Sequence, residues 1–371
     1  MRKIYLDNAS TTCPLKEVIF CINAAMIDYF GNASSLHEIG IKSERILRCA
    51  RKKIMKFIGA NEGDLYFTSG GTESNNMAIF GSLKKNHGKI ITSAIEHASV
   101  LNPIRQLGAK GFEIDIIYPD SFGNIQYGEL ESRINENTLL VSIMLINNEI
   151  GTINKIKEFS NIISKKSNAV FHVDAVQAFG KIPISVQNMG IDLMTMSAHK
   201  IHGPKGIGAL YVSKKIKIKP MFFGGSQEKE IRPGTEAVPL VAGFLKAIEL
   251  CDINKNYEKI EKINDYCREC LKKIKGVKIN SPADASPFIL NFSIPGIKSE
   301  IILNFLSERG IFISSASACS GNDRSHVLTA MNLDITQVDS ALRVSFSRFN
   351  SRQDIDTLIA NIKKALNDLI F

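Results

Sequence analysis

Residues 193–206 read LMTMSAHKIHGPKG, an apolar run followed by a turn rich in glycine and proline. The run at residues 193–196 is typical of a buried strand. Lys200 lies just beyond it, which is an unusual place for a solvated charge. A lysine held there can form a Schiff base with a carbonyl cofactor. Considered alone, a surface turn with an incidental lysine is the simpler explanation.

Short apolar runs alternate with amphipathic stretches on the N-terminal side of this motif. Residues 139–146 are almost entirely apolar, as expected of a strand covered on both faces. Strands that alternate with helical patterns predict an α/β fold, with a mostly parallel central sheet flanked by helices. The other expected strands are residues 65–67, 89–92, 112–118, 169–173, 193–196 and 207–212, and the expected helices are 73–83, 127–134 and 155–165.

The pattern changes near residue 250, where helices become longer and strands fewer. A chain of 371 residues is long enough for two domains. We predict a large domain over residues 14–250 and a smaller α+β domain made of residues 1–13 and 251–371. The elements expected in the second part are helices 254–274, 299–308 and 354–367 and a strand at 289–294.

The composition, 44% hydrophobic and 22% charged, excludes a disordered tail protein and a fibrous repeat. The net charge is +9, but the basic run at residues 214–219 lacks interleaved aromatic residues. We therefore favour a solvated surface over direct nucleic-acid binding, with an acidic protein or tRNA as the alternative partner. No apolar stretch approaches the ~20 residues that span a bilayer. We expect a cytoplasmic protein without a membrane segment.

Two further segments place polar residues at the ends of expected strands. FHVDAVQ at residues 171–177 puts Asp174 where ligands bind in open α/β sheets. A buried carboxylate there needs a partner such as a protonated pyridine nitrogen, although a helix-capping aspartate is equally consistent. TSGGTESNN at residues 68–76 leads from a strand into a helix, so it suits a phosphate or simply a capped helix. It is neither a Walker A nor a GxGxxG loop.

A fourth segment, IFISSASACSG at residues 311–321, places Cys319 among small polar residues. Small polar neighbours favour an exposed thiol. Such a thiol is either a reactive group or an inert cysteine in a loop. Cys267 and Cys270 form a CxxC on a helical pattern, but no second pair accompanies them, so we predict no metal site. Seven cysteines in 371 residues are too few for a disulfide scaffold.

Together, the four motifs resemble the cysteine desulfurases, pyridoxal phosphate (PLP) enzymes of fold type I within the class V aminotransferase family. The resemblance runs from YLDNASTT at residues 5–12 to LRVSF at residues 342–346. The other matching stretches are FGNASSLH at 30–37, Glu96-His97, NNEIG at 147–151 and RPGTE at 232–236.

The resemblance implies PLP as the cofactor, with Lys200 as its Schiff-base lysine. Asp174 is then expected to pair with the pyridinium nitrogen and Gln177 to bond the phenolic oxygen. His97 is expected to stack over the ring and to shuttle protons. The phosphate is expected at Gly71, Thr72, Ser197 and His199, and at Thr235 from the neighbouring subunit of a homodimer. Asn148 is expected to contact the cofactor and, with Asn32 and Arg343, the substrate carboxylate.

The reaction implied by the resemblance converts L-cysteine to L-alanine and transfers the sulfur to Cys319 as a persulfide. An acceptor protein for iron–sulfur cluster assembly or tRNA thiolation would then take the sulfur. The alternatives are a selenocysteine lyase or small-amino-acid aminotransferase of the same fold, or a scaffold protein without turnover. An aminotransferase has no need of Cys319, and intact Lys200, Asp174, His97 and Arg343 argue against the scaffold.

Three features depart from the family pattern. Ala316 replaces a usual glycine, and the stretch between Cys319 and Ser325 is shorter than in the long-loop group. The first predicts a stiffer hinge of the loop, and the second bears on the reach of Cys319 and on the identity of the sulfur acceptor. Ser10 replaces a usual alanine, which we expect to be a minor change.

Overall fold

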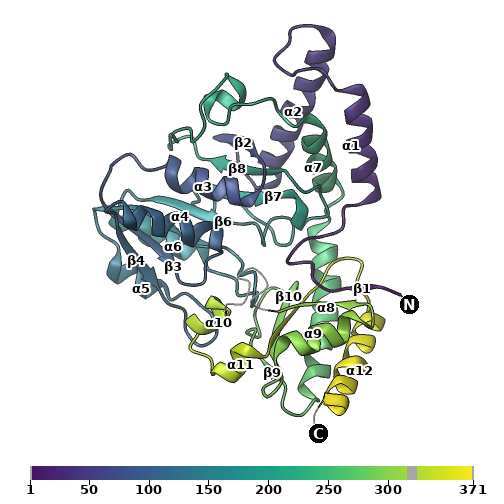
Figure 1. The fold of residues 1–371 in the computed structure, drawn as a ribbon. Helices are drawn as coiled ribbons and strands as arrows, with labels where there is room; N and C mark the ends of the chain where they lie inside the picture. Colours follow the sequence, from purple (N-terminus) through teal and green to yellow (C-terminus); the bar gives the residue numbers. More distant parts are fainter. Residues whose placement is uncertain (1, 316–323, 370–371) are drawn as a thin grey trace.

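The protein is described by a computed structural model over residues 2–315 and 324–369 (Figure 1). Its main sheet consists of β2 (Asp64–Thr68), β3 (Lys89–Ser93), β4 (Glu113–Ile117), β5 (Thr138–Ser142), β6 (Val170–Asp174), β7 (Leu193–Ser197) and β8 (Gly208–Val212). The strand order is β2-β8-β7-β6-β5-β3-β4. The strands from β7 to β4 pair in parallel, whereas β8 runs antiparallel to both of its neighbours. The expected α/β fold with a mostly parallel sheet is therefore confirmed.

Helices cover both faces of this sheet. Successive residues of a strand point to opposite faces, so neighbouring residues of one strand pack against different helices. Leu140 and Val170 pack with the apolar residues of α3 (Gly71–Gly81) and α4 (Ala98–Ala109). The next residues, Val141 and Phe171, pack in a second cluster on the opposite side. Burial of both faces explains why the strands lack a polar alternation. The helices that contribute to the second cluster include α2 (Glu38–Phe57), α6 (Ile156–Lys166) and α7 (Val238–Glu249).

Within residues 2–250, four helices lie outside the predicted ones, namely α1 (Lys16–Asp28), α2, α4 and α7. In α1, the exposed Phe20, Met26 and Ile27 place apolar side chains on the outer face, which obscures the amphipathic pattern. In α4, Pro103 lies inside the helix, where proline is unfavourable. The predicted helix at 127–134 is present as α5 (Tyr127–Arg133).

The strand expected over residues 139–146 is too long. β5 ends at Ser142. Beyond it, the Glu96 carboxylate accepts a hydrogen bond from the Met144 main-chain N–H at 2.9 Å. That N–H is therefore not available for pairing with β3, and residues 143–146 lie outside the strand. The Ile143 and Leu145 main-chain N–H groups still donate to main-chain oxygens of β6.

The second half of the chain forms a four-stranded sheet of order β12-β13-β10-β9. Its strands are β9 (Lys278–Ile279), β10 (Ile289–Ser293), β12 (Ser314–Ser315) and β13 (Ala341–Ser345). The helices of this part are α8 (Ile253–Lys272), α9 (Ser299–Ser307), α10 (His326–Ala330), α11 (Ile335–Asp339) and α12 (Arg352–Leu369). The chain start joins them, since β1 (Ile4–Tyr5) pairs in parallel with β11 (Ile311–Phe312) (Figure 1). The domain division near residue 250 stays a prediction.

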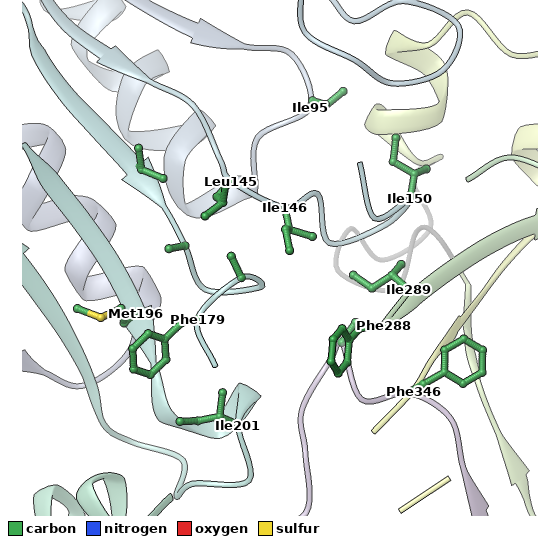
Figure 2. Close-up of a cluster of buried hydrophobic side chains, with 14 of the residues drawn as sticks. Ile95, Leu145, Ile146, Ile150, Phe179, Met196, Ile201, Phe288, Ile289 and Phe346 are labelled. Atoms are coloured by element: carbon green, nitrogen blue, oxygen red, sulfur yellow. The ribbon is translucent and has the colours of Figure 1, made fainter. Parts of the chain in front are cut away.

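One buried apolar cluster joins the two sheets. Figure 2 shows Ile146 and Ile150, from the loop after β5, close to Phe288 and Ile289 at the start of β10. The functional residues of both halves are thus held against a common core. Among the helices of the described residues, none is both long and apolar enough to cross a membrane.

Candidate active site

The carboxyl ends of β6 and β7 open onto a single cavity of about 260 Å³. Ligands bind at this edge of open α/β sheets because the loops after parallel strands converge there. Most of the predicted site residues meet in this cavity, although they come from both halves of the chain. They are Gly71, Thr72, His97, Asn148, Asp174, Gln177, Ser197, His199, Lys200 and Arg343.

Lys200 ends a short 3₁₀ helix, Ala198–Lys200, that follows β7 directly. Its Nζ donates hydrogen bonds to the main-chain oxygens of Ala9 at 2.6 Å and Ser10 at 2.7 Å. A segment from the start of the chain therefore helps to hold the lysine at the cavity.

Asp174 is buried at the end of β6. Oδ1 accepts the Val176 main-chain N–H at 2.9 Å, and Oδ2 accepts Asn75 Nδ2 at 2.8 Å. These donors stabilise the ionised carboxylate. Because Asp174 also lines the cavity, it can bind a cationic group of a ligand there.

The part of the cavity wall formed by Ser197 and Gly71 suits a phosphate group. Ser197 Oγ is buried in the cavity wall and has no hydrogen-bond partner among the described residues. At Gly71, a Cβ atom would lie only 2.9 Å from Val176 Cγ2, so glycine is required where α3 begins. The free N–H groups at the start of α3 and the unsatisfied hydroxyl together form a set of anion donors.

Gln177 is held at both ends of its amide. Nε2 donates to the main-chain oxygen of Ala9 at 2.8 Å, and Oε1 accepts from Lys181 Nζ at 2.8 Å. Lys181 is buried. No sequence motif identified it as a site residue, and the one feature that could have indicated it is its position four residues after Gln177. Burial lowers the pKa of Lys181 to about 7, and repulsion from Lys200 and Arg343 acts in the same direction.

We predict that Lys181→Met changes how stability depends on pH. The pKa of Lys181 lies below that of an unfolded lysine, so between pH 7 and 9 the unfolded state binds more protons. The wild-type free energy of unfolding should therefore rise relative to that of the variant by about 1 kcal/mol per pH unit. Urea unfolding at pH 7, 8 and 9 measures this difference. Lys205→Met, at an exposed position, is the control and should show no such trend.

Arg343 lies in β13 and is buried. Its Nη1 donates to the Asn148 main-chain oxygen at 2.9 Å, and its Nη2 donates to Asp7 Oδ1 at 2.9 Å and Ser10 Oγ at 2.6 Å. Its buried Nε has no partner among the described residues. The guanidinium is thus held rigidly while donor capacity remains for an anion. The Ser10 hydroxyl, expected to be of minor importance, contacts this arginine directly.

His97 is the N-cap residue of α4, and its Nδ1 accepts the Ser99 main-chain N–H at 3.1 Å. Burial lowers the pKa of His97 below its usual value, and attraction to the Asp174 carboxylate offsets this only in part. The imidazole is therefore neutral at physiological pH.

Some predicted site residues lie elsewhere. Asn32 and Thr235 are exposed and do not line this cavity, and the Asn32 side chain accepts the Ser34 main-chain N–H at 2.9 Å. Cys319 and Ala316 lie outside the described residues. Within the described part of the chain, no group of three or more His, Cys, Asp or Glu side chains is arranged to hold a metal.

Known proteins resemble this chain in sequence and in structure. The family described as Aminotransferase class-V matches residues 4–358. A cysteine desulfurase IscS of Methanosarcina thermophila is 40% identical over 376 residues, which cover 99% of this chain and 93% of that protein. A solved NifS-like protein has a TM-score of 0.93 at 34% identity and covers 99% of this chain and 100% of its own. Another structure, SspA in complex with cysteine, has a TM-score of 0.84 at 34% identity over 94% of this chain and 100% of its own.

These likenesses extend over nearly the whole chain and include both sheets. They confirm the resemblance noted in the sequence, and with it the expected fold. The chain belongs to the aminotransferase class-V family and, within it, to the cysteine desulfurases.

Proposed function

We propose that the protein is a PLP-dependent cysteine desulfurase that converts L-cysteine to L-alanine and carries the sulfur on Cys319. The observation that carries this proposal is the meeting of Lys200, Asp174 and Arg343 in one cavity. An amine, a carboxylate and a guanidinium there can serve a carbonyl cofactor, its ring nitrogen and an amino-acid carboxylate. The related SspA was solved with cysteine bound, which supports cysteine as the substrate.

The residues fit PLP at each of its polar groups. Lys200 would hold the aldehyde carbon and Asp174 the protonated ring nitrogen. Gln177 would donate its NH2 to the phenolic oxygen, because Lys181 already occupies the amide oxygen. The phosphate would bind Ser197, His199 and the start of α3 at Gly71 and Thr72. When bound, PLP supplies an electron-withdrawing ring that stabilises negative charge at the substrate Cα.

The chain's own side chains then bind cysteine and move its protons. Arg343 binds the carboxylate through N–H groups not used by Asp7, Ser10 and Asn148, and this contact orients the Cα–H bond. Lys200 accepts the α-proton as a free amine. The main-chain oxygens of Ala9 and Ser10 accept hydrogen bonds from its Nζ and so stabilise the ammonium that results.

The sulfur leaves by attack of the Cys319 thiolate. An S–S bond forms between Cys319 and the substrate sulfur as the substrate Cβ–S bond breaks. The bonding electrons stay with the substrate carbon, which takes up a proton on the way to alanine. We further propose that the protein is a cytoplasmic homodimer in which Thr235 reaches the neighbouring site. The acceptor of the persulfide sulfur is then a protein of iron–sulfur cluster assembly or tRNA thiolation.

The test of this function is Cys319→Ala in the holoenzyme supplied with L-cysteine and a thiol reductant. Sulfide release should be lost, while the absorbance of the bound cofactor stays as in the wild type. Mass spectrometry of the wild type without reductant should find one added sulfur on Cys319. Cys49→Ala, at an exposed position of α2, is the matched control and should keep full activity. Sulfide release that survives in Cys319→Ala would rule out the persulfide route.

A further inference from the structure

Two buried side chains in the cavity wall, Asn75 and Ser99, connect Asp174 to His97. Asn75 Nδ2 lies 2.8 Å from Asp174 Oδ2 and also 2.8 Å from Ser99 Oγ. Ser99 Oγ in turn lies 2.7 Å from His97 Nδ1. Asn75 is fully buried and Ser99 nearly so, so bulk water does not compete for these contacts. The three hydrogen bonds link two α-helices and the end of β6.

The direction of each hydrogen bond follows from the chemistry of its ends. The Asp174 carboxylate only accepts, so it must face the NH2 of Asn75. That NH2 only donates, so its second hydrogen goes to the Ser99 oxygen. The single hydroxyl hydrogen of Ser99 is then left for His97 Nδ1, which also receives the Ser99 main-chain N–H at 3.1 Å. Nδ1 therefore faces two donors and carries a lone pair.

We infer that Asn75 and Ser99 are positioning residues that hold His97 as a neutral imidazole with its one ring proton on Nε2. A proton on Nδ1 would point at two donors, so the imidazolium and the other tautomer are both disfavoured. A neutral imidazole is a poor proton donor but a good hydrogen-bond donor. His97 then acts on the substrate by donating a hydrogen bond from Nε2. This inference rests on the proposed function and deepens it, because it names the ring nitrogen through which His97 acts.

Charged and titratable groups around the ring have opposing effects. Asp174 favours the imidazolium, whereas Lys200 disfavours it, as burial does. The Asp174 carboxylate therefore favours protonation of the His97 ring, whereas the two Ser99 donors that face Nδ1 disfavour it. His326, at the start of α10, also interacts electrostatically with His97. His199 and Arg343 line the same cavity, and the buried Glu96 precedes His97 in the chain.

The experiment is nitrogen NMR of the holoenzyme with ¹⁵N-labelled histidine, with His97 assigned by His97→Gln. Without substrate, the wild type should carry the ring proton on Nε2 throughout pH 6–8. Ser99→Ala removes the hydroxyl donor and should raise the midpoint of His97 titration by about one pH unit. Ser99→Thr keeps a hydroxyl and should restore the wild-type spectrum. Ser164→Ala is the matched control, because its hydroxyl bonds only the main-chain oxygen of Asn161 in α6.

A wild-type ring proton on Nδ1, or a His97 midpoint near 6.5, would overturn the inference. An unchanged His97 titration in Ser99→Ala would do so as well. If Ser99→Ala does not fold, Asn75→Leu takes its place and must also raise the midpoint of His97 titration. Without the Asn75 NH2, the Ser99 oxygen is free to accept a hydrogen bond from a protonated His97 Nδ1. The spectra are recorded without substrate, so a protein that failed to desulfurate cysteine would still report its tautomer. In Ser99→Ala, we expect the rate of desulfuration at pH 6 to fall while the KM for cysteine stays unchanged.

Discussion

Replacing Lys200 with alanine should lower the rate of alanine formation from cysteine by about 10⁴-fold. The change removes the amine that attaches the cofactor and accepts the α-proton. Lys181 cannot take over this role, because its Nζ is bound to Gln177 Oε1 and it is buried behind the site. Amino-acid analysis of the reaction mixture measures the rate. Borohydride treatment should fix the cofactor to the wild type but not to the variant.

Lys205→Ala is the control for this experiment. Lys205 lies in the same glycine- and proline-rich turn but is exposed, so its loss should leave the rate unchanged. A small added amine should partly restore proton removal in Lys200→Ala, since it can act as the missing base. The role assigned to Lys200 is wrong if Lys200→Ala alone keeps a tenth of the wild-type rate.

Arg343→Leu should raise the KM for cysteine by about 10²-fold, because the substrate carboxylate loses its charged partner. The same change removes three hydrogen bonds and leaves Asp7 without the guanidinium that it contacts at 2.9 Å. We therefore also expect the free energy of unfolding to fall by about 1–3 kcal/mol. Steady-state kinetics and urea unfolding measure the two effects.

The double variant Asp7→Asn/Arg343→Leu separates binding from stability. Removal of the charge on Asp7 should recover part of the lost stability, because no isolated carboxylate remains. The KM for cysteine should stay high, since the guanidinium is still absent. A double variant with a KM near that of the wild type would show that Arg343 acts only through the fold.

The strands of the main sheet could be predicted from the sequence because each is a short apolar run that ends in polar or glycine-rich residues. The same rule placed Lys200 and Asp174 just beyond strand ends. It failed at β5, where the Glu96 side chain takes the N–H of Met144 and ends the pairing with β3. A contact between residues 48 positions apart leaves no trace in a local pattern.

Asn75, Ser99 and Lys181 escaped prediction for a related reason. Asn75 looks like a polar residue early in a helix, and its function depends on Asp174, which is 99 positions away. Lys181 follows a predicted motif, but only its burial distinguishes it from a surface lysine. Ser10 was judged minor because its contact with Arg343 joins residues 333 positions apart.

The sequence by itself determined the family, the α/β class and the strand ends at which Lys200 and Asp174 emerge. These properties depend on local apolar periodicity and on ordered motifs, which are present in the linear chain. Only the tertiary structure decided which atoms the side chains of Lys200 and Asp174 bond. Lys200, for example, donates to the main-chain oxygen of Ala9, 191 positions earlier in the chain. Hydrogen bonds depend on distances and angles set by the packing of distant segments. The tautomer inferred for His97 follows from that packing.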